Sequence, residues 1–249
     1  MEARMTSSRL PGKVLLKALK GMSMLEFMIN RVKRAKLIDE IVIATTINET
    51  DEPIVNLCDK LNVKYYRGSE KDVLLRVLNA HKKFKSDVIV ELTGDCPLID
   101  PNIVDEIILF YIENNYDYVS NSHLRSYPDG FDVQVFSTKL LSQVSSLTKN
   151  KYDRENVSSY IYRTNKYNIY GIVAPKELFW PNLRVTLDDK GDYLLIKKII
   201  KKLHREFGFS FRALDVINYL RKNLHLLDLI KDSRTSNAPY QLIANGPRD

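Results

Sequence analysis

The alternation of short apolar runs with amphipathic segments constrains the fold of this chain more than any other feature. Residues 40–46 and 87–92 are runs rich in Val, Ile and Leu, the form of a parallel strand that is buried on both faces. Stretches with apolar residues at helical spacing separate such runs. This order predicts an α/β fold, in which helices cover a doubly wound, mostly parallel sheet.

The same patterns predict the individual elements. Helices are expected over 24–35, 52–61, 71–84, 102–114, 152–164, 190–206 and 212–222, and strands over 40–46, 63–66, 87–92, 132–136, 167–173 and 184–187. In such sheets, ligands bind in the crevice beyond the carboxyl ends of the strands. The loops after residues 46, 66 and 92 should therefore share one rim.

The length of 249 residues suits one large domain and would be cramped for two. The strand–helix alternation loosens after residue 120, and a Tyr-Pro-Asp-Gly turn at 127–130 enters a strand of different character. We therefore expect a single domain over 1–249 with a small inserted lobe at about 121–175. Residues 232–249 are expected to form a mobile tail.

Composition argues against several other classes of protein. Two cysteines, Cys58 and Cys96, form neither a CxxC pair nor a disulfide framework, which indicates a reducing compartment. No apolar run approaches the roughly 20 residues of a bilayer span, and the N-terminus lacks the apolar core of a signal peptide. We expect a cytoplasmic protein without a membrane partner.

The net charge of +7 raises the alternative of a nucleic-acid-binding module, because clustered Lys and Arg attract phosphates. The densest basic group, at 197–202, lies within a strong helical pattern and is better explained as a solvated helix face. We expect no nucleic-acid partner. Salt-sensitive binding to DNA or RNA would favour the alternative.

The opening segment is a candidate phosphate-binding loop. Residues 3–13 gather Arg4, Arg9 and Lys13 with Ser7 and Ser8. Arg binds phosphate oxygens bidentately, Lys supplies a mobile point charge, and hydroxyls and backbone N–H groups satisfy the remaining acceptors. This composition suits a polyphosphate, and a disordered basic terminus is the alternative.

A carboxylate follows the strand at 87–92. The sequence Thr-Gly-Asp-Cys-Pro at 93–97 holds Asp95 at the rim, where a metal–polyphosphate would sit. Mg²⁺ usually takes one or two protein carboxylates together with phosphate oxygens and water. Asp95 is therefore a candidate metal ligand, with a simple capping role as the alternative. The four histidines have no metal spacing and are interpreted as surface or packing residues.

Several motifs stand in an order and approximate spacing shared with one enzyme family. They are residues 3–13, Arg67-Gly-Ser-Glu-Lys-Asp-Val-Leu74, Thr93-Gly-Asp-Cys-Pro-Leu-Ile-Asp100, Tyr127-Pro-Asp-Gly130 and Asp153-Arg-Glu155. The chain resembles, over about residues 3–220, the sugar cytidylyltransferases, especially the spore-coat-polysaccharide type related to the KDO and acylneuraminate enzymes. The resemblance implies a nucleotide-diphospho-sugar transferase-like fold. It also implies transfer of CMP from CTP to an acidic or phosphorylated sugar, with release of pyrophosphate, for surface polysaccharide or glycoconjugate biosynthesis.

The resemblance implies roles for individual residues. Arg4, Arg9, Lys13 and Asp95 would be catalytic, and Asp95 and Asp188 would hold Mg²⁺, with Asp189 as the alternative second ligand. The nucleotide would be bound by Ser7, Ser8, Arg67, Gly68, Ser69 and Gly94. The sugar would be bound by Arg125, Tyr127, Asp129, Asp132, Arg154 and Glu155. In the sugar site, Arg125 would be a charged partner for an acidic group. The lobe at 121–175 would serve sugar binding or dimerisation, which leaves a homodimer open.

The chain also departs from the family pattern. Asn156 and Ser159 stand where His and Pro are usual, so the acceptor can be a keto-sugar acid or a sugar or polyol phosphate. Only Met1 and Glu2 precede the loop, where the family has an apolar strand, so we expect the first strand to be missing. A non-catalytic nucleotide-sugar-binding homologue is the alternative function, and the retained Lys13, Asp95 and Asp188 argue against it.

Overall fold

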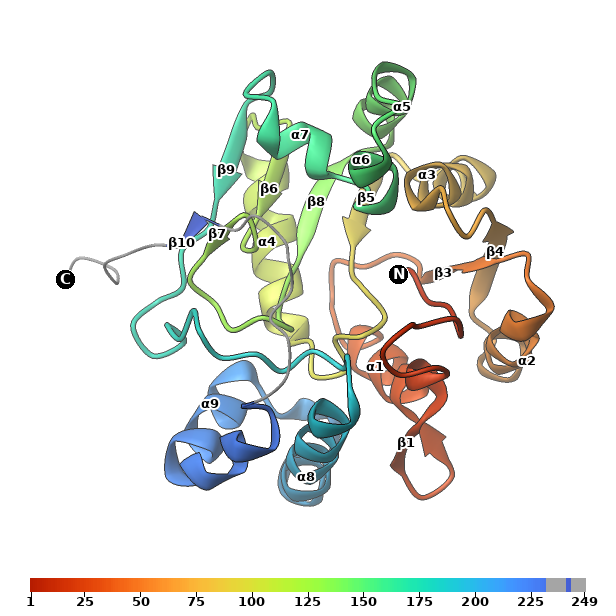
Figure 1. Cartoon of the computed structure of the whole chain (residues 1–249). Helices are drawn as coiled ribbons and strands as arrows, with labels where there is room; N and C mark the ends of the chain where they lie inside the picture. Colours follow the sequence, from red (N-terminus) through yellow and green to blue (C-terminus); the bar gives the residue numbers. More distant parts are fainter. Residues whose placement is uncertain (232–240, 243–249) are drawn as a thin grey trace.

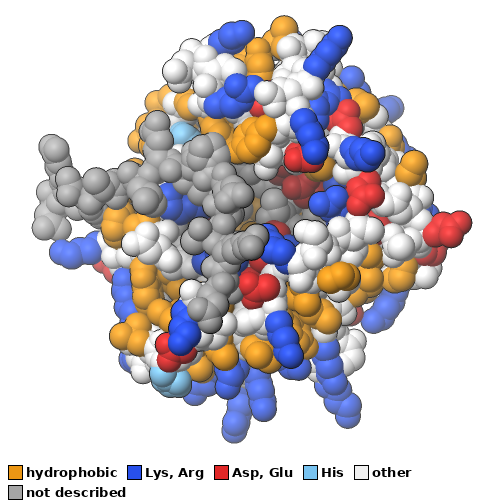
Figure 2. All heavy atoms as spheres, viewed as in Figure 1, with side chains coloured by type: hydrophobic (Ala, Val, Ile, Leu, Met, Phe, Trp, Pro, Cys, Tyr) orange, Lys and Arg blue, Asp and Glu red, His pale blue; other side chains and the backbone are white. Residues whose placement is uncertain are grey.

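The computed structural model describes residues 1–231 and 241–242 (Figure 1). The tail expected at 232–249 therefore lies, apart from two residues, outside the described part of the chain. Among the described residues, no helix is both long and apolar enough to cross a membrane. Lys and Arg side chains are spread over the visible face rather than gathered in one patch (Figure 2).

The sheet is assembled from two groups of strands. β3 (Val42–Thr46) pairs in parallel with β4 (Lys64–Gly68). The second group follows the order β5 (Val88–Glu91), β8 (Gln134–Ser137), β6 (Tyr118–Ser120) and β9 (Ile169–Gly171). β8 runs antiparallel to both of its neighbours, whereas β9 is parallel to β6. The predicted α/β class is confirmed, and the sheet is mixed, because β8 is antiparallel to its neighbours.

The first three residues join the two groups of strands. On one side, the Ala3 N–H donates to the Ala44 carbonyl at 3.3 Å; on the other, the Glu2 N–H donates to the Leu92 carbonyl at 3.3 Å. Glu2 bridges in parallel to Ala44 of β3 and to Thr93, two residues beyond β5. We expected the first strand to be missing, but residues 1–3 occupy a central position in the sheet.

A cavity of about 570 Å³ extends from Met1 between β3 and β5, toward their amino ends. Its walls include Val42, Val88, Val90 and Ile108. The Leu92 carbonyl accepts from Glu2, whereas the Asp87 carbonyl accepts from the residue that follows β8. Because backbone groups alternate in direction along a strand, those of Val88 and Val90 face this cavity.

Helices cover both faces of the sheet (Figure 1). One face carries α1 (Met24–Val32), α2 (Glu52–Leu61), α4 (Pro101–Glu113), α8 (Lys190–Phe207) and α9 (Ala213–Lys222). The other carries α3 (Val73–Phe84), α5 (Thr138–Leu147), α6 (Lys151–Glu155) and α7 (Ser159–Arg163). Val135 packs into the first core and the adjacent Phe136 into the second, because successive strand residues point to opposite faces.

Shorter elements complete the chain. β1 (Lys17–Leu19) and β2 (Met22–Ser23) form an antiparallel pair, and β7 (Leu124–Arg125) pairs in parallel with β10 (Gln241–Leu242). Turns of 3₁₀-helix lie at Lys13–Leu15, Glu49–Asp51, Gly208–Ser210 and Leu224–Leu229.

Two local predictions, for residues 152–164 and 184–187, were wrong, and part of the expected lobe at 121–175 lies within the main sheet. The helix expected over 152–164 is interrupted between α6 and α7, where Val157 has a φ of 38°. The strand expected over 184–187 is absent, because the Val185 and Leu187 N–H groups donate to the loop carbonyls of Asp129 and Asp95. β8, from the segment expected to form an inserted lobe, lies within the main sheet between β5 and β6. A role of residues 121–175 in sugar binding or dimerisation stays a prediction.

Candidate active site

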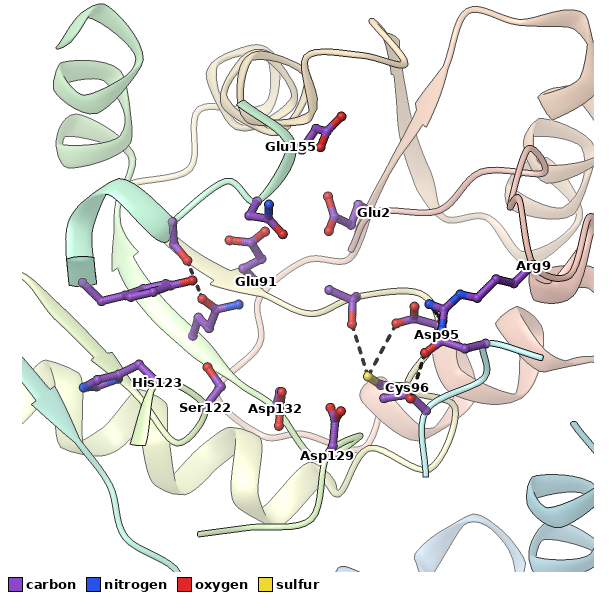
Figure 3. A pocket seen from close by; sticks show the side chains of 17 residues that line it. Glu2, Arg9, Glu91, Asp95, Cys96, Ser122, His123, Asp129, Asp132 and Glu155 are labelled. Carbon is purple, nitrogen blue, oxygen red and sulfur yellow. Dashed lines mark hydrogen bonds and ion pairs between the residues drawn. The ribbon is translucent and has the colours of Figure 1, made fainter. Parts of the chain in front are cut away.

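Two adjoining cavities lie beyond the carboxyl ends of β3 and β5. The first, here called the loop basin, has a volume of about 380 Å³ and is lined by the loop at 3–13 together with Gly94, Asp95 and Asp188. The second, the inner pocket, has a volume of about 220 Å³ and continues from Asp95 toward Ser122 and His123 (Figure 3). Arg9, Asp95 and Asp188 line both cavities, which therefore form one cleft.

A buried carboxylate ties the loop to the sheet. Asp51 accepts the Met5 N–H at 2.7 Å through one oxygen. Its other oxygen accepts the Thr46 N–H at 3.0 Å and the hydroxyls of Thr45 and Thr46 at 3.0 and 2.6 Å. Burial alone would raise the pKa of Asp51, but these hydrogen bonds hold it below its usual value. The loop is thereby held at the end of β3 by a carboxylate that stays ionised at neutral pH.

Four charged side chains from three distant segments meet in the cleft. Lys13 Nζ lies 2.8 Å from Asp95 Oδ2 and 2.9 Å from Asp188 Oδ1. Arg9 Nη2 lies 2.8 Å from the same oxygen of Asp188. Although burial opposes both shifts, Asp95 and Asp188 raise the pKa of Lys13, and Lys13 holds the pKa of Asp95 below its usual value. Lys13 and Asp95 are therefore both ionised at neutral pH.

The geometry separates the two alternative metal ligands. Asp188 faces the cleft and accepts from Arg184 at 3.3 Å and from the Thr186 hydroxyl at 3.1 Å. Asp189 instead caps α8, where it accepts the Asp192 N–H at 3.1 Å. The arrangement supports Asp188 rather than Asp189 as the second ligand.

Asp95 and Asp188 fit the donor set that Mg²⁺ takes from proteins. Both carboxylates contact one ammonium, so they converge on a single point, and Mg²⁺ usually binds one or two such groups. Within residues 1–231 and 241–242, no group of three or more His, Cys, Asp or Glu is arranged to hold a metal. The other ligands of a metal at this point would be phosphate oxygens and water.

The predicted nucleotide residues fall into two sets. Ser7, Ser8 and Gly94 line the loop basin with Arg4. At Gly94, a Cβ would stand 2.6 Å from the Glu2 carbonyl, so the close approach of the first segment requires glycine there.

Arg67 does not line either cavity. Its guanidinium donates to the Thr46 carbonyl at 3.0 Å and the Asn48 carbonyl at 2.8 Å, and pairs with Glu52 at 2.6 Å. It therefore ties the end of β4 to the loop that follows β3. A direct contact of Arg67 with the nucleotide stays a prediction that this geometry does not favour.

Gly68 and Ser69 contact Arg76, a cation that the sequence analysis did not predict as a site residue. A Cβ at Gly68 would stand 2.9 Å from Arg76 Cγ, and the Ser69 carbonyl accepts from Arg76 Nη1 at 2.6 Å. Arg76 is 3% exposed and lines the loop basin. Its position inside a helical pattern offered no signal that it would reach the cleft.

The residues predicted to bind the sugar also fall into two sets, those that line the inner pocket and those that do not. Asp129, Asp132 and Glu155 line the inner pocket. Arg125 lies beneath it, 2% exposed, with its two Nη atoms 2.6 and 2.9 Å from the Asp132 oxygens and 3.7 Å from Asp129. The charged partner expected for an acidic group of the sugar is therefore already paired with protein carboxylates. Tyr127 is 1% exposed and packs in the core.

Arg154 likewise has a role outside the cleft. It pairs with Asp72, at the start of α3, and donates to the Ser145 carbonyl at 2.9 Å in α5. The guanidinium thus holds α6 against two neighbouring helices, and the structure does not bring it to the inner pocket.

Several lining residues of the inner pocket were not predicted as site residues. Among them are Glu2, Glu91, Cys96 and His123. His123 lies 3.0 Å from the Ser120 hydroxyl, and burial lowers its pKa to about 4, so it is neutral at pH 7. Burial raises the pKa of the Cys96 thiol well above its usual value, which supports its interpretation as an unreactive thiol. A Glu within the apolar run at 87–92 was a signal that could have singled out Glu91.

Comparison with known proteins places these features in context. A family model described as cytidylyltransferase matches residues 1–207. The Methanocaldococcus jannaschii protein MJ1063 is 36% identical over 94% of both chains. The spore coat polysaccharide biosynthesis protein SpsF of Bacillus subtilis is 33% identical over 90% of this chain and 93% of its own.

Solved structures show the same architecture. A cytidylyltransferase from Leptospira borgpetersenii is 31% identical and superposes with a TM-score of 0.84 over 95% of this chain and 97% of its own. CMP:2-keto-3-deoxy-manno-octonic acid synthetase, solved with CTP, is 16% identical and superposes with a TM-score of 0.60 over 83% of this chain and 97% of its own. The second likeness concerns the fold alone.

Proposed function

Since the chain belongs to the cytidylyltransferase family, we propose that it transfers CMP from CTP to an acidic or phosphorylated sugar. CTP-dependent cytidylyl transfer follows from the family, and the identity of the acceptor is the proposal. The acceptor would be a keto-sugar acid or the phosphate of a sugar or polyol. The similarity to the spore coat polysaccharide biosynthesis protein of Bacillus subtilis supports a role in surface polysaccharide or glycoconjugate biosynthesis.

The meeting of Lys13, Asp95 and Asp188 is the observation that carries the proposal. The triphosphate would lie in the loop basin, where Arg4, Arg9 and Lys13 neutralise its charge. Arg9 and Lys13 already sit at the junction of the two cavities, 2.8 and 2.9 Å from Asp188. Preorganised cations of this kind stabilise developing charge without reorganisation during the reaction.

In the reaction, an acceptor oxygen attacks the α-phosphorus of CTP: the new oxygen–phosphorus bond forms, the bond to the pyrophosphate oxygen breaks, and pyrophosphate leaves. Where the acceptor is a hydroxyl group, its proton is released to water. Residues of the inner pocket would orient the acceptor, with Asp129, Asp132 and Glu155 available to accept hydroxyl hydrogen bonds. We propose that the divalent metal is Mg²⁺, held by Asp95 and Asp188, which would neutralise charge on the phosphates. Positioning and electrostatics are the contributions of the protein.

The alternative is a homologue that binds a nucleotide sugar without turnover. The cluster at Lys13 argues against it, because three buried or half-buried charges are costly to keep without a use. The two functions are distinguished by measuring pyrophosphate release separately from CTP binding.

The test measures pyrophosphate release with CTP, Mg²⁺ and a panel of keto-sugar acids and sugar or polyol phosphates. CTP should support release much faster than ATP or GTP. Asp95→Asn should lower the rate about 100-fold or more while the fold is retained, because it removes charge from the site and nothing from the core. Asp59→Asn, an exposed change on α2, is the matched control.

Two outcomes would contradict the proposal. Tight CTP binding with no pyrophosphate from any acceptor would favour the non-catalytic homologue. A near-normal rate in Asp95→Asn would place the metal elsewhere.

A further inference from the structure

The inner pocket contains two carboxylates that the transfer chemistry leaves without a role. Glu91 ends β5 and is 5% exposed, and Glu2 comes from the segment between β3 and β5. One oxygen of each, Oε2, is buried with no hydrogen-bond partner among the described residues. Figure 3 shows both side chains directed toward the same part of the pocket. A buried polar atom without a partner is costly, so this pair calls for a ligand.

The other carboxylates of the pocket are neutralised or exposed. Asp95 and Asp188 contact Lys13 at 2.8 and 2.9 Å. Asp132 and Asp129 lie 2.6 and 3.7 Å from Arg125. Glu155, whose side chain is 49% exposed, stands 3.8 Å from Lys151. Glu2 and Glu91 are therefore the buried carboxyl groups of the pocket that form no ion pair within 4 Å among the described residues.

Two cations stand near this pair and partly offset the effect of burial on the pKa of Glu2, but their printed hydrogen bonds go to backbone carbonyls. The Met1 ammonium donates to the Val42 carbonyl at 2.9 Å, and Arg76 donates to the Ser69 carbonyl at 2.6 Å. Burial and the neighbouring Glu2 raise the pKa of Glu91 well above its usual value. A ligand that brings hydrogen-bond donors and positive charge would satisfy both carboxylates at once. An ammonium group supplies three N–H donors and one positive charge, whereas a hydroxyl supplies one donor and no charge.

We propose that Glu2 and Glu91 bind a protonated amino group of the acceptor, which is therefore an amino sugar derivative. The inference rests on the proposed function, since it specifies the acceptor of that reaction. The reacting phosphate or acid end would face Arg9, and the amine would face the two carboxylates. Gln134 accepts the Tyr118 hydroxyl at 2.8 Å through its oxygen, so its amide nitrogen is the side that donates to a ligand.

The test compares matched acceptors by calorimetry on the chain saturated with Mg²⁺ and a non-hydrolysable CTP analogue. The first series is glucose 1-phosphate, its amino analogues with the amine at each ring or exocyclic position in turn, and their N-acetyl forms. The second is a 2-keto-3-deoxy sugar acid with and without a free amino group. At least one amine should bind about tenfold or more tightly than its hydroxyl and N-acetyl counterparts, the range of a charge-assisted hydrogen bond.

Glu91→Gln should reduce this preference to less than about threefold, and Glu2→Gln is a second variant should the first fail to fold. Glu113→Gln, exposed at the end of α4, is the matched control and should keep the preference. Affinity for the CTP analogue is measured for every protein, so that a general loss of the site is recognised.

Two results would overturn the inference: no amine is preferred by the wild-type chain, or the preference survives both substitutions. Failure of the wild-type chain to bind the CTP analogue would instead contradict the proposed function.

Discussion

Replacement of Lys13 by Met removes the central charge of the site while preserving much of the side-chain length. Lys13 Nζ contacts Asp95 and Asp188 at 2.8 and 2.9 Å, and the Lys13 side chain is only 12% exposed. Asp188 would keep Arg9 at 2.8 Å and Arg184 at 3.3 Å. Asp95 would lose its only ion pair among the described residues. The cost of Lys13→Met is therefore mainly the cost of leaving one carboxylate without a cation.

The size of this cost follows from burial. Breaking a buried ion pair by removing one partner costs about 3–5 kcal/mol. The Asp95 side chain is 27% exposed, so water screens part of its charge, and the lower end, about 3 kcal/mol, is expected. For a chain of this size, about 1 kcal/mol moves the melting temperature by about 2–4 °C, so a fall of about 6–12 °C follows.

The pH of the measurement follows from the sign of the shifts. The lowered pKa of Asp95 contributes stability that is present above its usual value of 3.8 and lost as pH falls through the folded value. The raised pKa of Lys13 contributes stability that is present below 10.5 and lost as pH rises through the folded value. At pH 7 both contributions are complete, so melts at pH 7 without metal report the full effect.

The assay is a thermal melt of three variants against the wild-type chain. Lys17→Met, an exposed change on β1, is the matched control and should alter the melting temperature little. The double variant Lys13→Met/Asp95→Asn should recover much of the loss, because the uncompensated charge is gone. Mg²⁺ should stabilise Lys13→Met more than the wild-type chain, since the metal then no longer competes with the Lys13 ammonium for the two carboxylates. A Lys13→Met melt equal to that of Lys17→Met, or no recovery in the double variant, would refute the reasoning.

Three further predictions test other parts of the molecule. Five or six apolar residues attached before Met1 should fill the cavity of about 570 Å³ between β3 and β5. This should raise both the melting temperature and the affinity for CTP. An equal effect from a Gly/Ser extension of the same length would contradict this prediction. Burial and a neighbouring carboxylate raise the pKa of Asp129 from 3.8 to about 7, so wild-type stability is lost as pH rises between these values. Asp129→Asn should melt higher than the wild-type chain at pH 8 and about equally at pH 4. A pH-independent difference in melting temperature would contradict the raised pKa of Asp129. Arg31 is fully buried and donates to four backbone carbonyls. Arg31→Met should therefore lower the free energy of unfolding, measured by urea denaturation, by about 4 kcal/mol or more. A loss no larger than that of Arg34→Met, a change at an exposed neighbour, would show that water satisfies those carbonyls.

The elements that the sequence predicted well are those whose signal is local. The helix at 52–61 has the predicted bounds, and the helix at 102–114 is displaced by one residue at each end. Apolar periodicity reports which face of a segment is buried, and it needs no knowledge of the neighbours. The same logic failed at Arg31, which reads as a polar position on a helix. The fold buries it because carbonyl groups from residues 98–99 and 209–211 converge on its guanidinium.

Local sequence patterns did not predict the order of the strands in the sheet. The strand at 132–136 was predicted nearly in place as β8, but its position between β5 and β6 depends on pairing with strands far along the chain. Likewise, the pairing of residues 1–3 with both β3 and β5 involves backbone groups, which carry no side-chain signal. Backbone pairing is set by the assembled sheet rather than by the composition of one strand.

For the site, the sequence by itself determined which chemistry was available, because the motifs around Lys13 and Asp95 combine phosphate-binding and metal-binding side chains in short segments. Only the tertiary structure decided which of these side chains meet. It brought Lys13 to carboxylates 82 and 175 residues away, selected Asp188 over Asp189, and turned Arg125 toward protein carboxylates. It also added Glu2 and Glu91, whose significance lies in burial without a partner. Burial and partnership are properties of the packed chain, since each depends on residues that the local sequence does not specify.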